Sequence, residues 1–496
     1  MDALDKLTAV ISEGLPDKEG RESLAARTAE AIDAVFGERY PAKTKYARRV
    51  VMMPADDNVS FAGLLHPDNP TSGVYGGMSL IWFPVAASDD QPPSTLLTLV
   101  CGTRGLSPDE HIMGRPGHVR HLRALQRHLA KQCKTFSWIK PDPTDLNDNI
   151  PKVAQQKLPQ FASIFKRYGH HIYACAEVPK DAKAAKTIVS SFLDFYAWER
   201  EWTPLKKFAS EVENLKLSLR GNMFPRTDLE QVYDLLMQRR FVILQGPPGT
   251  GKTRMATQVL KEKFGDSGFS VQFHPAVSYE TFVSGISPSV EDSNLSFQVK
   301  SGWLLDAIDA CGDKPYLLHI DEINRADLSR VLGEAIYLFE PREIAEGAGR
   351  KVRLQNATGE GDNELSMPAE LFLLGTMNSA DRSIAIMDMA VRRRFAFVDV
   401  WPDIDVVRAQ GIDLATEAFS QIQDIFCQYA SDDSFNLLPG HSYFLAGDES
   451  ELKNRFRYEL IPLLQEYLQE GRLASCETEL RAYIDWLGSE IDIYAN

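Results

Sequence analysis

One eight-residue string combines the residue types and the spacing of a loop that holds phosphate groups. Residues 246–253 read Gly-Pro-Pro-Gly-Thr-Gly-Lys-Thr, after the apolar run 241–244 and before a stretch compatible with a helix. Its glycines let the backbone fold tightly, so that successive N–H groups can point at phosphate oxygens. This setting favours a nucleotide-binding loop over a glycine-rich turn that binds nothing. The predicted nucleotide-binding residues are Gly246, Pro247, Pro248, Gly249, Thr250, Gly251, Lys252 and Thr253.

The last two residues of this loop have the side chains that a triphosphate requires. The Lys252 ammonium group can reach the β- and γ-phosphates, and the Thr253 hydroxyl can ligate Mg²⁺. The expected ligands are therefore a nucleoside triphosphate, GTP or ATP, and Mg²⁺.

A second string places two carboxylates at the end of an apolar run. Residues 316–322 read Tyr-Leu-Leu-His-Ile-Asp-Glu, which predicts a buried parallel strand with both acids at its carboxyl end. Asp321 is expected to hold the magnesium ion, directly or through water, and Glu322 to act as the general base on the attacking water. Two solvated acids at a strand end are the alternative, and the preceding phosphate loop makes it less favourable.

A third apolar run, 372–376, is followed by Asn378, which could orient the attacking water from a strand between the other two. Arg392, Arg393 and Arg394 come shortly afterwards. Such a run is usually a solvated or structural cluster, but phosphoryl transfer also needs cations around the γ-phosphate. We expect Arg392 or Arg393 to be supplied to the pocket of a neighbouring subunit. The predicted catalytic residues are Lys252, Glu322, Asn378, Arg392 and Arg393.

The pattern of elements predicts two different kinds of fold along the chain. From residue 228, short apolar strands alternate with helices, as in a parallel sheet with helices on both faces. Residues 1–200 predict an α+β domain, residues 201–227 a linker, 228–402 an α/β nucleotide-binding core, and 403–496 a helical lid and C-terminal segment. The expected strands of the core are 241–244, 270–273, 316–320, 372–376 and 395–400. The N-terminal domain is expected to contain helices at 2–14 and 20–37 and strands at 46–53, 78–86 and 94–102.

Composition bounds the class of protein. A chain of 496 residues is longer than one hydrophobic core usually supports, and no apolar run is long enough to span a membrane. The six cysteines show no paired spacing, which is typical of reduced thiols, and the N-terminus lacks a secretory pattern; we therefore expect a cytoplasmic protein. The net charge of −15 repels nucleic acid globally, so any DNA contact requires a local basic patch.

The order of these strings resembles that of an AAA+ NTPase. Further strings resemble the McrB-type motor subunit of McrBC modification-dependent restriction systems, and the resemblance covers about residues 228–470. The string 375–383, Gly-Thr-Met-Asn-Ser-Ala-Asp-Arg-Ser, is the most discriminating of them. The others are 271–275, 278–282, 320–326 and 440–444.

The resemblance implies a homo-hexameric ring with the nucleotide between subunits, a helical lid, and a separate McrC-like nuclease that stimulates hydrolysis. It makes GTP plausible and leaves ATP open. It also implies an N-terminal domain that reads DNA, often modified DNA. Two alternatives remain: a MoxR-type chaperone, which usually has Asn-Pro where this chain has Asn378-Ser379, and a nucleotide-gated DNA-binding switch that does not hydrolyse nucleotide, against which Glu322 and Asn378 argue.

The N-terminal domain offers one candidate surface for DNA. The stretch 115–140 has no acidic residue, and four of its cations fall at helical spacing on one face. A solvated face or an ion-pair surface is an equally good interpretation. The candidates are Arg120, Arg123, Arg127 and Lys131.

Two other candidate sites in this domain are weaker. A set of aromatic residues could line a pocket for a flipped base, but more often such residues pack a core. A nuclease-like set, Asp142, Glu177 and Lys180, has the wrong spacing, so strand cleavage is assigned to another chain. The aromatic residues are Trp82, Phe83, Phe136 and Trp138.

Overall fold

The computed structural model of the chain divides into two compact units. Unit 1 comprises residues 1–223 and 427–431, and unit 2 comprises residues 224–426 and 432–496. Each unit is described by itself. The described residues are 2–41, 46–54, 58–88, 91–291, 294–354, 364–380 and 389–491.

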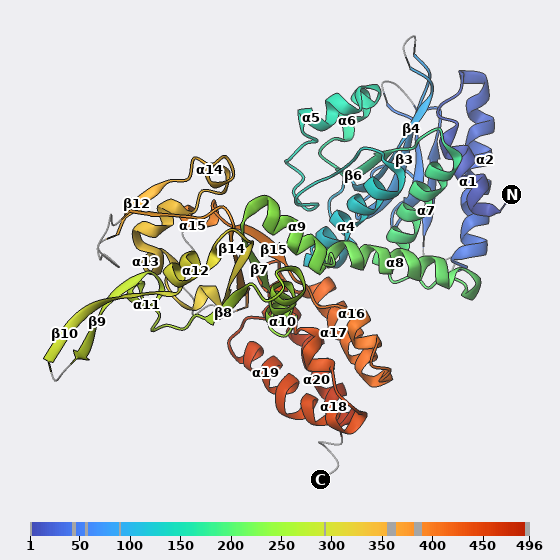
Figure 1. Cartoon of the computed structure of the whole chain (residues 1–496). Helices are drawn as coiled ribbons and strands as arrows, with labels where there is room; N and C mark the ends of the chain where they lie inside the picture. Colours follow the sequence, from blue (N-terminus) through green and yellow to red (C-terminus); the bar gives the residue numbers. More distant parts are fainter. Residues whose placement is uncertain are drawn as a thin grey trace. The chain divides into compact units, whose positions relative to one another are not determined.

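Unit 2 is built around a five-stranded parallel sheet in the order β15-β7-β14-β11-β8 (Figure 1). The prediction of a parallel α/β core is confirmed, as is the placement of the strand of Asn378 between the strands of the phosphate loop and of the two acids. Its strands are β7 (Phe241–Gly246), β8 (Gly268–Gln272), β11 (Tyr316–Asp321), β14 (Leu371–Asn378) and β15 (Ala396–Asp399).

Both faces of this sheet are buried, which explains why its strands are continuously apolar. Successive side chains point to opposite faces: Phe241 and Ile243 join one hydrophobic cluster, and Val242 and Leu244 join the other. Helices α9 and α10 cover the second cluster, whereas α11, α12 and α13 contribute to the first. The helices of the core are α9 (Leu229–Arg239), α10 (Lys252–Gln258), α11 (Tyr279–Phe282), α12 (Trp303–Cys311), α13 (Leu328–Leu332), α14 (Pro341–Ala345) and α15 (Met389–Arg392).

The C-terminal part of unit 2 is helical, as predicted. Its longest helix has a fully buried apolar stripe, with Ala415, Ala418, Phe419, Ile422 and Phe426 at helical spacing. A π-helical turn, 456–460, joins two of the other helices into one continuous helical segment. The helices are α16 (Ile404–Arg408), α17 (Asp413–Tyr429), α18 (Glu449–Arg455), α19 (Ile461–Gln469) and α20 (Glu477–Glu490).

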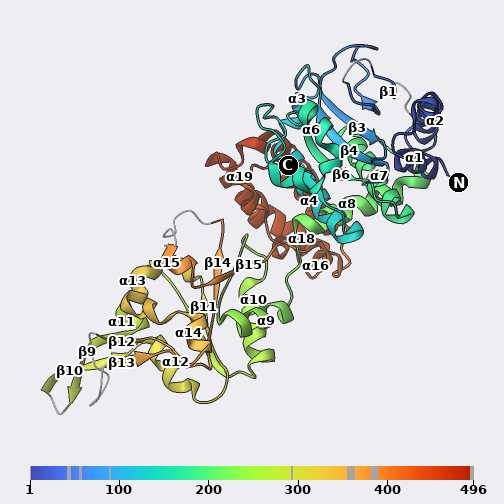
Figure 2. The same cartoon turned by 90° about the horizontal axis from the view of Figure 1, so that it is seen from above.

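Two hairpins interrupt the core, and neither was predicted. The longer one, β9 (Ser284–Glu291) with β10 (Asn294–Ser301), projects from between α11 and α12 (Figures 1 and 2). The shorter one pairs β12 (Lys351–Arg353) with β13 (Glu364–Ser366). The longer hairpin escapes prediction because its strands are rich in Ser and contain Pro288, which is depleted in strands.

Unit 1 is an α+β domain with a six-stranded sheet in the order β1-β2-β3-β4-β6-β5, in which every neighbouring pair is antiparallel. Three of these strands, β1, β3 and β4, were predicted, and the other three, β2, β5 and β6, were not. The strands are β1 (Ala47–Val51), β2 (Phe61–Leu65), β3 (Met78–Val85), β4 (Ser94–Cys101), β5 (Ser137–Ile139) and β6 (Ile172–Glu177). The helices are α1 (Ala3–Ser12), α2 (Arg21–Arg39), α3 (Glu110–Met113), α4 (Pro116–Cys133), α5 (Lys152–Lys157), α6 (Ala162–Tyr168), α7 (Ala182–Glu199) and α8 (Ala209–Met223).

The stretch 201–227, which was predicted to be a linker, is mostly helical. It contains α8, a 15-residue helix that belongs to unit 1 and packs on α4. Val212, Leu215 and Leu219 lie on the buried side of α8, and this helical spacing explains why the segment folds onto its neighbour. In the described residues, no helix has both the length and the apolar character needed to cross a membrane.

Candidate nucleotide-binding site

The phosphate loop has the backbone shape that its glycines permit. It connects β7 to α10, and Gly249 and Gly251 adopt φ values of +76° and +79°, which only glycine adopts readily. The loop therefore directs its backbone toward a ligand in the way that a phosphate cradle requires.

Lys252 lies inside this loop and not in solvent. The side chain is 9% exposed, and its Nζ donates to the carbonyl oxygens of Gly246 and Pro247 at 3.0 and 2.7 Å. Burial lowers the pKa of Lys252 to about 8, and the carboxylates of Glu322 and Asp321 oppose that shift. Negative charge added beside this ammonium group would therefore stabilise the protonated form of Lys252.

The structure brings three predicted residues together at the end of β11. The hydroxyl of Thr253 donates to Asp321 Oδ1 at 2.7 Å. Thr376, on the neighbouring strand β14, donates to the same oxygen at 2.5 Å and accepts the backbone N–H of Glu322 at 3.1 Å. Thr376 therefore fixes the positions of both acids.

The sequence argument gave Thr376 no role. It lay within the string 375–383 that carries the family resemblance, but its side chain is 2% exposed and reads as an ordinary strand residue. Only the pairing of β14 with β11 places its hydroxyl between the two acids.

Glu322 is held in an unusual backbone conformation. Its φ is +53°, which is uncommon for a residue with a side chain and is typical of functional sites. The Glu322 Oε2 atom is buried and has no hydrogen-bond partner among the described residues, although the Arg325 guanidinium lies 3.5 Å from it. A carboxylate oxygen in this state can accept a proton or a hydrogen bond from a water molecule.

Asn378 ends β14 beside the phosphate loop, in register with Gly246. Its Oδ1 accepts the backbone N–H of Ala380 at 3.1 Å, and its carbonyl oxygen accepts a hydrogen bond from Asn324 at 3.2 Å. These two hydrogen bonds fix the backbone and the side-chain oxygen of Asn378. The side-chain NH₂ group takes part in neither of them. Asp381, Arg382 and Ser383, the next part of the family-like string, lie outside the described residues.

The three consecutive arginines have different environments. Arg394 is 5% exposed and pairs with Glu340 at 2.9 Å. Arg393 is 66% exposed and lies 3.4 Å from the same carboxylate, and the exposed Arg392 guanidinium lies 5.6 Å from the centre of the Phe397 ring. Arg394 is therefore a structural residue, whereas Arg392 and Arg393 present their cationic groups outward.

A lid segment lies directly on the phosphate loop, a contact that the sequence does not predict. The backbone N–H groups of Gly440 and Ser442 donate to the carbonyl oxygens of Pro248 and Gly249 at 2.9 and 3.0 Å. A Cβ atom at Gly440 would lie 2.2 Å or less from the Gly249 carbonyl group, so only glycine fits. The string 440–444 had been recognised by resemblance alone, because the contact spans almost 200 residues of sequence.

The oxygen atoms at this site fit a Mg²⁺ ion. The Thr253 hydroxyl and the Asp321 carboxylate are hard oxygen donors of the type that magnesium prefers, and they already lie within hydrogen-bonding distance of each other. Among the described residues there is no group of three or more His, Cys, Asp or Glu that could hold a metal. The remaining ligands would therefore come from phosphate oxygens and water.

The predicted DNA-contacting row on α4 needs correction. Arg120 is 8% exposed, and both its terminal nitrogens donate to backbone carbonyls of unit 1, those of Cys427 and Ala430. Arg127 and Lys131 are exposed, but both bond to Asn222 of α8. Arg123 is exposed. Arg120 is thus removed from the candidate surface, because the spacing of cations on a helix does not reveal which side another helix covers.

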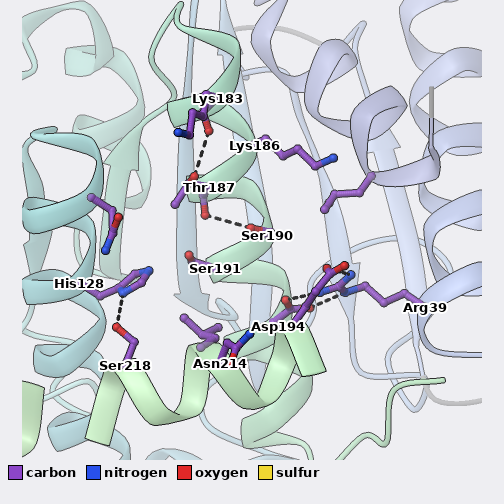
Figure 3. Close-up of a pocket in the computed structure, with 14 residues that line it drawn as sticks. Arg39, His128, Lys183, Lys186, Thr187, Ser190, Ser191, Asp194, Asn214 and Ser218 are labelled. Carbon is purple, nitrogen blue, oxygen red and sulfur yellow. Dashed lines mark hydrogen bonds and ion pairs between the residues drawn. The ribbon is translucent and has the colours of Figure 1, made fainter. Parts of the chain in front are cut away.

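The aromatic set of unit 1 belongs to its core. Phe83 is part of a buried cluster against which Phe136 and Trp138 pack, and Trp82 is 2% exposed. A separate cavity of about 480 Å³ lies between α4, α7 and α8, and its lining includes His128 of α4 and Thr187, Ser190 and Ser191 of α7 (Figure 3). None of the described residues that line it is a Phe, Tyr or Trp.

The sheet order, the phosphate loop, the two acids and the helical lid define a P-loop NTPase of the AAA class. The family profile described as "AAA domain (dynein-related subfamily)" matches residues 241–395, and that described as "McrB, alpha-helical lid domain" matches residues 431–473.

Similarity to one relative over most of that protein's length establishes the family of this chain. The chain is 30% identical over 356 residues to the "Type IV methyl-directed restriction enzyme EcoKMcrB subunit" of Escherichia coli (strain K12), covering 65% of this chain and 75% of that protein. It is 26% identical over 189 residues to the "Type II restriction enzyme BsuMI component YdiS" of Bacillus subtilis (strain 168), covering 31% of this chain and 55% of that protein. The chain belongs to the McrB family of AAA+ proteins.

Proposed function

We propose that this chain is the nucleotide-driven motor subunit of a restriction system in which a separate, McrC-like chain cuts the DNA. In the cell it would form a homo-hexameric ring and use GTP or ATP hydrolysis to translocate or remodel DNA selected by unit 1. The printed descriptions of both relatives, a methyl-directed restriction enzyme subunit and a restriction enzyme component, support a role in restriction.

The observation that carries the hydrolytic part of the proposal is the shared hydrogen bonding of Thr376. It holds the Asp321 carboxylate beside Thr253 and fixes the backbone of Glu322. When bound, Mg²⁺ would neutralise charge on the phosphates. Glu322 accepts the proton of the attacking water, Asn378 orients that water, and Lys252 stabilises the charge that develops on the phosphate oxygens.

The remaining cation is proposed to come from a second copy. Arg392 and Arg393 are exposed, and among the described residues the ion pair of Arg393 is a 3.4 Å contact with Glu340. An arginine supplied in trans is worth roughly 10³–10⁵ in rate, so hydrolysis by this design depends on assembly.

The test is NTP turnover by the full chain with GTP or ATP, with and without modified DNA and the co-encoded partner. Lys252→Ala should lose nucleotide binding and hydrolysis, because the variant lacks the cation that the loop surrounds. Full activity in Lys252→Ala would contradict the proposal. Background turnover of the wild-type chain under every condition would favour the non-hydrolysing switch. Since the chain belongs to the McrB family, the MoxR-type alternative has no separate support.

A further inference from the structure

His441 lies between the two lid residues that are bonded to the phosphate loop. Gly440 and Ser442, its neighbours on either side, donate their backbone N–H groups to Pro248 and Gly249. The position of the His441 backbone relative to the loop is therefore fixed on both sides. Its side chain takes no part in these two hydrogen bonds.

The hydrogen bonding of the ring defines which nitrogen carries the proton. His441 Nδ1 accepts the backbone N–H of Asp403 at 3.2 Å, so in the neutral ring the proton is on Nε2. Burial lowers the pKa of His441; the Arg254 guanidinium lowers it further and the Asp403 carboxylate opposes both. The ring is thus a neutral imidazole near pH 7, with Nε2–H as a hydrogen-bond donor.

The donor nitrogen lies at the phosphate loop. His441 Nε2 is 3.6 Å from the place that a Cβ atom of Gly251 would occupy, and it is the only atom among the described residues within 4 Å of that place, apart from Gly251 and its chain neighbours. Gly251 has a φ of +79° and immediately precedes Lys252 at the start of α10. The imidazole therefore lies against the phosphate loop at Gly251.

We propose that His441 is a nucleotide-contacting residue, and that its Nε2–H donates a hydrogen bond to an oxygen of the phosphate chain held at Gly251. This inference rests on the proposed function, since it requires a nucleotide at the loop. The contact links the bound nucleotide to the lid, because the three consecutive residues 440–442 carry both the imidazole and the two backbone hydrogen bonds to the loop.

A purely structural role for His441 predicts a different pattern of substitutions. The structural contact is made by Nδ1, whereas the proposed nucleotide contact is made by Nε2. The amide of Asn can replace Nδ1, and the amide N–H of Gln reaches the position of Nε2. His441→Gln and His441→Asn therefore separate the two roles, even if His441→Ala fails to fold.

The experiment measures nucleotide affinity of the full chain by titration with a fluorescent NTP analogue and by competition with unlabelled NTP. His441→Ala and His441→Asn should bind about tenfold more weakly than the wild type, as expected for loss of one hydrogen bond to a charged group. His441→Gln should remain within about threefold of the wild type. His111→Gln, at an exposed position in unit 1, is the matched control and should bind normally.

Three outcomes would overturn the inference. Affinity retained by Asn and lost by Gln would assign His441 to the Asp403 contact alone. A loss that disappears when the 2′-deoxynucleotide is used would place the contact on the ribose and not on phosphate. Normal affinity in His441→Ala, together with loss of binding in Lys252→Ala, would reject the His441 contact while leaving the proposed function intact. Failure of the wild-type chain to bind any NTP would instead reject the proposed function.

Discussion

At the end of β14 one hydroxyl group serves both acids of the site. Thr376 Oγ1 donates to Asp321 and accepts from the backbone of Glu322, and it is buried. Because this hydroxyl is buried and bonded to both groups, it restricts the movement of the Asp321 carboxylate and of the Glu322 backbone. The geometry of the proposed metal ligand and that of the proposed base are therefore coupled through a residue that need not touch the nucleotide.

Replacing Thr376 by Val keeps the shape of the side chain and removes the hydroxyl. We expect kcat for NTP hydrolysis to fall by about ten- to a hundredfold, because Asp321 and the Glu322 backbone each lose a partner in a buried place. Thr376→Ser keeps the hydroxyl and is the matched control, with activity close to that of the wild type. Steady-state turnover measures the effect, and unchanged kcat in Thr376→Val would remove Thr376 from the positioning of the acids.

The pKa of Lys252 gives a second prediction at this scale. Burial lowers it to about 8, so about half of these groups are unprotonated at pH 8 without nucleotide. The negative charge of a bound triphosphate raises the pKa again, so that binding takes up about half a proton at pH 8 and more at pH 9. Isothermal titration calorimetry in buffers of different ionisation enthalpy measures this uptake. A binding enthalpy independent of buffer at both pH values would contradict it.

The sequence predicted those residues of the site whose role depends on local context. Lys252 and Thr253 follow a strand and three glycines, and Asp321 and Glu322 end an apolar run, so short strings were enough. Thr376 and His441 could not be assigned in this way. Their roles depend on strand pairing and on a contact between distant parts of the chain.

Among the elements, the lid segment that ends in η8 (His441–Phe444) is in close contact with the phosphate loop. Gly440 approaches Gly249 closely from the lid, while a Cβ atom at Gly249 would lie 2.3 Å from Ser442 Oγ. Two backbone hydrogen bonds accompany this packing. The lid therefore contributes directly to the shape of the loop.

Substituting Gly440 by Ala tests this arrangement. The added methyl group would collide with the Gly249 backbone, so we expect nucleotide affinity to fall at least about tenfold as the loop or the lid is displaced. Gly447→Ala, where the new atom meets only the flexible end of Glu451, is the control within the same lid. Fluorescent-nucleotide binding measures both variants. Equal affinities would show that the contact is dispensable.

The elements that sequence patterns predicted well are the buried ones. The strands of the parallel sheet are apolar on both faces and lie next to helices, which gives a strong pattern. The β9–β10 hairpin was missed because β9 is rich in Ser and contains Pro288, although apolar and polar residues alternate along β10, where Phe297 and Val299 are exposed. The burial of Arg120 was missed because cations at helical spacing resemble a solvated face.

For the whole molecule, the proposed use of Arg393 by a second copy can be tested by mixing variants. Arg393→Ala should bind nucleotide normally and lose hydrolysis by about a thousandfold or more. Lys252→Ala should be inactive for a different reason, because its own loop is defective. If the arginine acts in trans, a mixture of the two inactive variants should recover part of the activity, since each supplies what the other lacks.

The controls separate catalysis from folding. Arg408→Ala, at an exposed position in the lid, should hydrolyse nucleotide like the wild type. Arg394→Ala should lower the melting temperature, because it leaves Glu340 without its closest partner. A mixture that stays inactive, with both variants folded and co-assembled by size-exclusion chromatography, would indicate that Arg393 acts within its own chain.

The cluster around Glu340 has an electrostatic consequence for such encounters. Arg350, Arg393 and Arg394 all lie within 3.4 Å of this carboxylate, Glu343 pairs with Arg350 at 2.6 Å, and Arg392 is adjacent in sequence. In a chain with a net charge of −15, these described side chains at this corner carry more positive than negative charge. At long range two copies repel each other, whereas an anion brought within a Debye length of this corner meets an attractive field. Moderate salt should thus increase the rate at which two copies associate and weaken the binding of phosphate groups at this corner.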